Sequence, residues 1–173
     1  MENQVSSKSI IVNYGVILGA ISISISVVLY ALGMHLEQNW VTGVLGFLAM
    51  VIILVIGIKK FKESKGGFLT WGQAVKIGVG ISVVSAILAT IYNLIFINFI
   101  EPGFMSQMME IQQQAWADAG MSGDQIEQSL EMAKKFQNPA VTTAIGILAA
   151  AFFGFIISAI AGAIMKESEE EEY

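Results

Sequence analysis

The stretch AVTTAIGILAAAFFGFIISAIAGAIM, residues 140–165, decides the fold of this chain. Its 26 residues include no charged side chain. A helix rises about 1.5 Å per residue, so a helix of this length exceeds a hydrocarbon core of about 30 Å. The stretch therefore predicts a transmembrane helix.

Small residues occupy every fourth position of this stretch. We call them the ridge: Thr142, Gly146, Ala150, Gly154, Ser158 and Gly162. Lipid chains are as apolar as leucine, so helices in a bilayer associate by close backbone approach, which small residues permit. We interpret the ridge as a helix-packing surface. A four-residue step drifts by about 40° around a helix, so we expect 146–154 to meet one helix and 154–162 another.

The composition indicates a membrane protein of several spans. The chain has 173 residues, of which 55% are hydrophobic and 13% charged, and its mean hydropathy is +0.68. It contains no cysteine, which excludes disulfides and thiolate sites. All nine basic residues are lysine and the net charge is −5, which argues against a nucleic-acid partner.

Four apolar runs predict four transmembrane helices in a single all-α domain. Their expected bounds are about 10–33, 40–58, 77–100 and 140–165. The first run is too long for the apolar core of a signal peptide. It also carries Gly15 and Gly19 at four-residue spacing, which we assign to helix packing.

Aromatic and basic residues flank these runs. Trp40 opens the second span, where an interfacial aromatic residue is expected. The next loop is basic, with Lys59, Lys60, Lys62 and Lys65. We expect the segment 68–76, which includes Trp71, to be amphipathic and to lie in the headgroup region.

The polar loop 101–139 predicts a short amphipathic helical hairpin between the third and fourth spans. Pro102 ends the third span because proline cannot continue a helix. Ser122 with Gln125 forms the pattern of a capping box, which opens the second helix of the hairpin. Asn138 and Pro139 then supply an N-cap and a first helical residue for the last span.

Two isolated polar residues and one charged segment complete the pattern. We expect His35 to be a solvated loop residue, since no second His or Cys exists to form a metal site with it. We expect Asn93, inside the third span, to form a hydrogen bond to another helix, and the alternative is a contact with a ligand. The acidic tail 166–173 has the composition of a disordered, solvated segment.

The lysines predict the orientation. Seven of them fall on one side of the four predicted spans: Lys8, Lys59, Lys60, Lys62, Lys65, Lys76 and Lys166. Only Lys134 and Lys135 fall on the other. By the positive-inside rule both termini are cytoplasmic and the loop 101–139 lies outside. We expect a multi-pass protein of the cell membrane, the inner membrane where there are two.

Several short motifs together resemble the bacterial membrane family called domain of unknown function 4199. They are Tyr14-Gly15 with Gly19, the run GFLTWGQA at 67–74 with Lys76 and Gly78, Ile91-Tyr92-Asn93, Ile100-Glu101-Pro102, Gly120-Met121-Ser122, and Ile126-Glu127. The resemblance covers nearly the whole chain and is most specific at Thr70–Ala74. The family has no assigned activity, so the resemblance implies architecture and membrane location and carries over no catalytic residue.

The sequence favours a non-enzymatic membrane protein that acts by association, either with itself or with a membrane-protein partner. We expect no catalytic, cofactor or metal site, because one His and no Cys offer no general base or metal cluster. The alternative is a small transporter or channel subunit. Against transport, no ionisable residue and no proline fall within the predicted spans.

Overall fold

The computed structural model describes residues 6–37, 40–136 and 138–167. Over these residues the chain is helical, and its elements follow in the order α1 (Ser7–Ala31), α2 (Trp40–Ser64), α3 (Trp71–Ile95), the π-helical turn η1 (Phe96–Ile100), α4 (Phe104–Asp118), α5 (Gly123–Phe136) and α6 (Pro139–Met165). The prediction of an all-α protein is confirmed.

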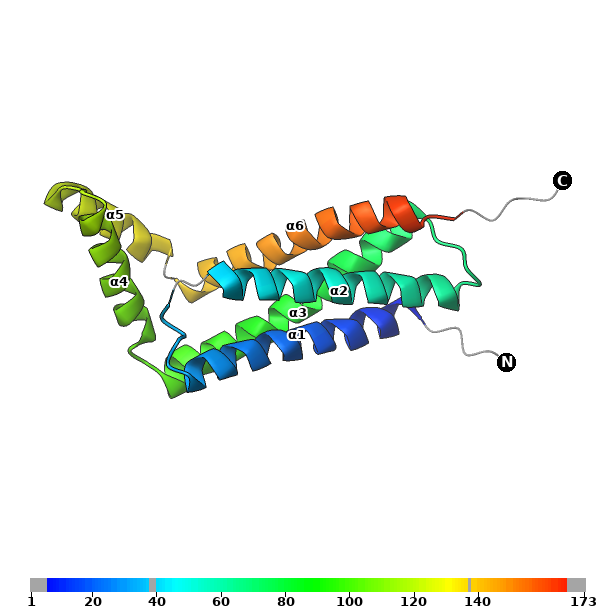
Figure 1. The fold of residues 1–173 in the computed structure, drawn as a ribbon, viewed down its shortest axis with the longest axis horizontal. Helices are drawn as coiled ribbons and strands as arrows, with labels where there is room; N and C mark the ends of the chain where they lie inside the picture. Colours follow the sequence, from blue (N-terminus) through cyan, green and yellow to red (C-terminus); the bar gives the residue numbers. More distant parts are fainter. Residues whose placement is uncertain (1–5, 38–39, 137, 168–173) are drawn as a thin grey trace.

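The four long helices form an elongated bundle, and α4 and α5 project from one end of it (Figure 1). We call this the hairpin end. The other end carries the α2–α3 connection with its lysines, and we call it the lysine end. The start of α1 and the end of α6 lie toward the lysine end (Figure 1).

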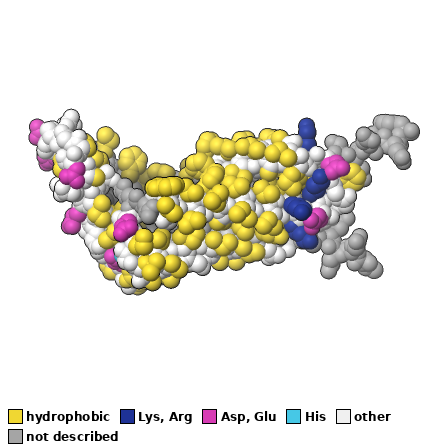
Figure 2. All heavy atoms as spheres, in the orientation of Figure 1, with side chains coloured by type: hydrophobic (Ala, Val, Ile, Leu, Met, Phe, Trp, Pro, Cys, Tyr) yellow, Lys and Arg dark blue, Asp and Glu magenta, His cyan; other side chains and the backbone are white. Residues whose placement is uncertain are grey.

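Each of the four long helices is long and apolar enough to cross a membrane. Figure 2 shows hydrophobic side chains covering the length of the bundle, with charged side chains gathered at its two ends. Such a band between polar ends matches the hydrocarbon core of a bilayer. The protein is therefore a four-span membrane protein.

The third long helix begins before the predicted span, at Trp71 rather than 77, because Thr70 and Gln73 form a capping box. The Thr70 hydroxyl accepts from Gln73 N at 3.3 Å, and the Gln73 carboxamide accepts from Thr70 N at 3.0 Å. Within segment 68–76, Leu69 is buried, whereas Trp71 is 46% exposed and donates its indole N–H to the Ala159 carbonyl at 3.0 Å. Trp40 is 77% exposed. The headgroup location of both tryptophans stays a prediction.

Helix α3 is the centre of the bundle and packs most extensively against α6 and α1. Its contact with α6, which we call the seam, pairs small residues of the two helices. A Cβ added to Gly154 would lie 2.7 Å from Ser82 Cβ, and one added to Gly162 would lie 2.7 Å from Ala74 Cβ. Gly78, which belongs to α3, makes the same kind of contact: a Cβ added to it would collide with Ser158 of α6.

The sequence predicted that 146–154 meets one helix and 154–162 another. Gly154 and Gly162 both contact α3, in agreement with the second part, whereas a Cβ added to Gly146 would meet no neighbouring helix within 4 Å. The two contacts with α3 arise because α3 carries Ala74, Gly78 and Ser82 at the same four-residue spacing, so two ridges with equal drift wrap around each other.

The glycines of α1 also lie against α3. A Cβ on Gly15 would lie 2.6 Å from Val84 Cβ, and one on Gly19 would lie 2.9 Å from Leu88 Cδ1. These two residues occupy helix contacts, as the sequence predicted for them.

The apolar core lies in the half of the bundle near the lysine end. Its most buried side chains come from all four helices: Ile10, Leu54, Ile58, Ile77, Ile81 and Ile157. In the half near the hairpin end the helices are looser. A Cβ added to Gly43, Gly46 or Gly146 would meet no atom within 4 Å. The bundle is thus closed at the lysine end and open toward the hairpin end.

The hairpin of α4 and α5 forms as the sequence predicted. Gly120 ends α4 with φ of 81°, a backbone conformation that glycine adopts readily. The Ser122 hydroxyl accepts from Gln125 N at 3.4 Å, and Ser122 N donates to the Gln125 side chain at 2.9 Å, which completes the predicted capping box. The Asn138 side chain caps α6 by accepting from Ala140 N at 2.9 Å.

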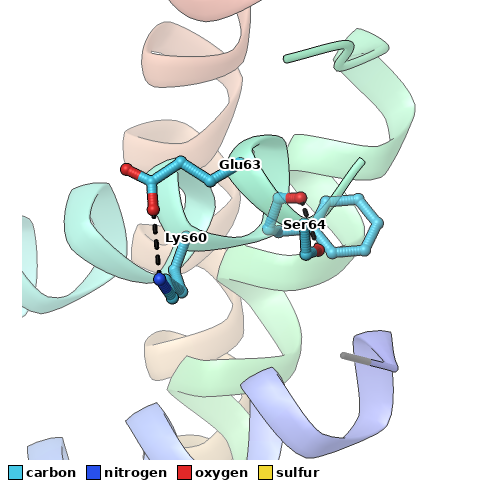
Figure 3. A network of polar contacts seen from close by, with 4 residues as sticks. Lys60, Glu63 and Ser64 are labelled. Atoms are coloured by element: carbon cyan, nitrogen blue, oxygen red, sulfur yellow. Dashed lines mark hydrogen bonds and ion pairs between the residues drawn. The ribbon is translucent and has the colours of Figure 1, made fainter. Parts of the chain in front are cut away.

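An ion pair lies on the surface of the lysine end. Lys60 and Glu63 form an exposed ion pair of 3.2 Å, beside which the Ser64 hydroxyl donates to the Phe61 carbonyl at 2.8 Å (Figure 3). Lys59 and Lys65 are exposed. Surface pairs of this kind contribute about 0–1 kcal/mol.

The first acidic residue of the tail is held by two contacts. The Glu167 backbone pairs with Leu69, and its carboxylate pairs with Lys62. The hydrogen bond from Lys62 and its positive charge hold the pKa of Glu167 below its ordinary value. The Glu167 carboxylate therefore stays ionised at neutral pH. The prediction of a solvated, disordered tail otherwise concerns residues 168–173, which lie outside the described residues.

Candidate functional site

A cavity of about 540 Å³ lies between all four spans and the start of α4, in the open half of the bundle. Its apolar lining includes Leu18, Gly46, Met50, Leu94, Met105, Gly146 and Ala150. Its polar lining consists of Ser22, Ser82, Ser85, Thr90, Asn93, Thr142 and Thr143. None of these described lining residues is charged. We call this space the central cavity.

The central cavity exists because small residues face it from two sides. Gly46 of α2 and Gly146 of α6 present no side chain, and nothing lies within 4 Å of where their Cβ atoms would be. The sequence predicted Gly146 and Ala150 as helix-packing residues. Both line the cavity, and Gly146 has no neighbouring helix within 4 Å of where its Cβ would be.

Some hydroxyl groups in the cavity already donate to nearby backbone carbonyls. Ser22 donates to the Leu18 carbonyl at 3.0 Å and Ser82 to the Gly78 carbonyl at 2.9 Å. The Thr142 hydroxyl contacts the carbonyl of Asn138, one turn back, at 3.2 Å and that of Phe136, at the end of α5, at 2.8 Å. Serine and threonine in a helix commonly bond to the preceding turn in this way.

Asn93 differs from these hydroxyls. No hydrogen-bond partner for its carboxamide is found among the residues that the structure describes, so the expected bond to another helix is absent there. The side chain instead lines the central cavity. A carboxamide offers two N–H donors and an acceptor oxygen. Asn93 is thus the polar group of the cavity best able to bind an occupant.

A smaller cavity of about 140 Å³ adjoins the first. Asn93 lines both, and the other lining residues are Ser26, Leu29, His35, Tyr92, Phe96 and Phe104. The two spaces therefore share one carboxamide, and a titratable side chain borders the smaller one.

His35 is not the solvated loop residue that the sequence predicted. Its side chain is only 17% exposed, as is that of Glu101, and the His35 Nε2 and Glu101 Oε2 atoms are 2.8 Å apart. Three aromatic rings surround the imidazole: Tyr30 at 5.0 Å, Phe104 at 6.1 Å and Phe96 at 6.2 Å between ring centroids. Glu101 lies 66 positions further along the chain, so no local pattern around His35 indicates this pairing.

The contact between His35 and Glu101 is close but lacks the alignment of a hydrogen bond. Neither imidazole nitrogen, nor Glu101 Oε2, makes a hydrogen bond within the described residues, although all three atoms are buried. The other carboxylate oxygen, Oε1, accepts from the Gln107 carboxamide at 3.2 Å. The carboxylate therefore links the α1–α2 connection to α4.

The π-helical turn places Glu101. The Glu101 backbone N–H donates to the Phe96 carbonyl at 2.8 Å, five residues back. A π-turn adds a residue to a helical turn and frequently occurs at functional sites. Here it directs Glu101 toward the α1–α2 connection and buries Phe96 beside His35.

The arrangement is suited to binding. The described lining of the central cavity holds hydroxyls, one carboxamide and apolar groups, which can position a neutral molecule. In the described part of the chain no three His, Asp or Glu side chains come together as a metal site would require.

The sequence prediction did not include this cavity, although the polar residues of α3 carry a signal for it. Ser82, Ser85, Thr90 and Asn93 recur at spacings that share one helical face. Taken singly, these residues indicate helix packing or one hydrogen bond, whereas together they form a polar stripe. Thr142 and Thr143 on α6 complete the cavity, and their approach to that stripe depends on the tertiary fold.

Comparisons with known proteins identify the family but no activity. The chain matches the family described as protein of unknown function (DUF4199) over residues 13–167, most of its length. The resemblance inferred from the sequence is thereby confirmed. Comparison with curated proteins and with solved structures finds no match. The described structure and this match establish that the chain belongs to the DUF4199 family of membrane proteins.

Proposed function

We propose that this protein is non-enzymatic and acts by binding another molecule within the bilayer, with the central cavity as the binding site. The observation that carries the proposal is Asn93, a carboxamide that lines a cavity of about 540 Å³ without a partner among the described residues. Small-molecule sites span about 300–1,000 Å³ and combine apolar walls with a few polar groups.

The chemistry of the lining supports binding over catalysis. Hydrolysis or group transfer needs a nucleophile with a base beside it, or a metal ion. The hydroxyls of Ser22, Ser82 and Thr142 donate to backbone carbonyls. His35, the one imidazole of the chain, faces Glu101 beside the smaller cavity.

Blocking the cavity is expected to abolish binding. In Gly146→Phe the new ring enters open space, so the fold is retained and the cavity is filled. Wild type and variant are purified in mild detergent and studied by native mass spectrometry for co-purifying small molecules. We expect bound molecules with the wild type and at least tenfold less with Gly146→Phe, at an unchanged unfolding temperature.

The matched control is Gly43→Phe, which adds the same ring to an open surface of α2 outside the cavity lining. Equal occupancy in wild type and Gly146→Phe would contradict the proposal. The same spectra count copies per particle. A second copy or a stoichiometric second protein, with no bound small molecule, would favour the association function instead.

We propose that the lysine end is cytoplasmic, together with both termini. The support is the excess of lysines on that side of the four spans. A cysteine at Ser122 in the α4–α5 hairpin should then react with an impermeant thiol reagent in intact cells or spheroplasts. A cysteine at Ser64 should react only after permeabilisation. The reverse pattern would overturn the orientation.

A second candidate function, transport, is favoured by the asymmetry of the bundle. The apolar core closes the lysine end, whereas the central cavity lies toward the hairpin end. Alternating access requires a site that is open on one side at a time. Transport and simple binding would use the same cavity. Transport would be established if proteoliposomes with the wild-type protein took up the co-purifying small molecule and those with Gly146→Phe did not.

A further inference from the structure

We propose that the central cavity binds a neutral amphiphile: an apolar body with one hydroxyl or carbonyl group, which pairs with the Asn93 carboxamide. This inference rests on the proposed function and specifies the chemistry of its ligand. Three features carry it: the charge of the lining, the position of Asn93, and the balance of polar and apolar groups.

The lining selects against charged ligands. None of the described residues around the central cavity is acidic or basic. A charge moved into a site of low dielectric constant without a counter-charge loses much of its solvation free energy. The described lining therefore offers no counter-charge to a carboxylate or an ammonium group placed beside Asn93.

Asn93 selects for a hydrogen-bonding group. Asn93 is an exposed residue that borders both cavities, and a ligand that pairs with its carboxamide replaces water there. Its N–H groups can donate to a hydroxyl or carbonyl oxygen, and its own oxygen can accept from a hydroxyl. A plain hydrocarbon chain would fill the space but would leave this carboxamide unpaired.

The remaining lining fits an apolar body. Leu18, Met50, Leu94 and Ala150 face the cavity from four helices. The hydroxyls of Ser22, Ser82 and Thr142 already donate to backbone carbonyls, which lowers their demand for a ligand. Those of Ser85, Thr90 and Thr143 have no hydrogen bond among the described residues and add neutral polar positions beside Asn93. Neutral polar groups within apolar walls suit an amphiphile whose polar group is uncharged.

A matched set of probes tests this specificity. The full chain, purified in detergent, is labelled with photoreactive probes that share one alkyl chain with a diazirine and end in a hydroxyl, a carboxylate, a trimethylammonium or a methyl group. At pH 8, half-maximal labelling of cavity peptides should need about fivefold to tenfold less hydroxyl probe than methyl probe. It should need at least tenfold less hydroxyl probe than either charged probe.

The variant Asn93→Leu isolates the carboxamide. It should label equally with the hydroxyl and methyl probes, while labelling by the methyl probe stays as in the wild type. The matched control is Asn13→Leu, an exposed asparagine of α1 outside the cavity, which should keep the wild-type preference. Thermal unfolding of each variant confirms that it is folded.

The outcomes separate this inference from the proposed function. Equal labelling by the hydroxyl, carboxylate and methyl probes, or an unchanged preference in Asn93→Leu, would overturn the neutral-amphiphile assignment. The cavity would remain a binding site if Gly146→Phe still blocked labelling. If every probe labelled the wild type and Gly146→Phe equally, both the neutral-amphiphile inference and the proposed function would be overturned.

Discussion

Replacing Gly154 by isoleucine is expected to destabilise the bundle by about 3 kcal/mol or more, because it overpacks a contact that has no free space. A Cβ at this position would lie 2.7 Å from Ser82 Cβ on α3, closer than two such atoms can approach. The helices must then separate along the seam. Thermal unfolding in detergent, followed by size-exclusion chromatography, measures the loss.

The matched control is Ala149→Ile. Ala149 is exposed and lies off the ridge, so the same side chain should change the unfolding temperature little. A second test exchanges the residues across the seam: Gly154→Ser should destabilise, and adding Ser82→Gly should restore much of the loss. Equal tolerance of isoleucine at both positions would show that α3 and α6 do not pack through this contact.

Removing either member of the His35 and Glu101 pair is expected to cost about 1–3 kcal/mol of stability, because the partner is left buried and unpaired. The double variant His35→Ala, Glu101→Ala should cost less than the sum of the single variants, by about 0.5–3 kcal/mol. This difference arises because the first substitution already removes the contact of 2.8 Å. Chemical or thermal unfolding of the four proteins measures it.

Glu37→Ala supplies the control for this cycle. Glu37 belongs to the same connection as His35 but is exposed, so its loss should change stability by less than about 0.5 kcal/mol. Strictly additive losses in the His35 and Glu101 variants would show that the two side chains do not interact in the folded protein.

The features that the sequence predicted are those that depend on local pattern. Uncharged runs predicted four spans, and residue pairs such as Ser122 with Gln125 predicted helix caps. The start of α3 was predictable by the same rule, since Thr70 with Gln73 is also a capping box. The predicted span begins at residue 77 because the residues before it, Phe68–Lys76, also fit an amphipathic interfacial segment.

The features that the sequence did not predict depend on distant parts of the chain. His35 was expected to be solvated because its neighbour Glu101 and the ring of Phe104 arrive from beyond α3, through a π-turn that no local pattern indicates. Gly146 and Gly154 belong to one ridge, yet only Gly154 packs. That difference follows from the looser half of the bundle, which is a property of all four helices together.

The seam also has a consequence for how the chain is made. Between the end of η1 at Ile100 and the start of α6 at Pro139 the ribosome must add 38 residues, which takes roughly 2–8 s at usual rates of synthesis. During this interval α3 sits in the bilayer without its principal partner. In the folded protein the Ser82 hydroxyl donates to the Gly78 carbonyl of its own helix, as the Ser158 hydroxyl does to the Gly154 carbonyl on α6. Each of these bonds lies within a single helix, so neither hydroxyl depends on the pairing of α3 with α6 for its hydrogen bond.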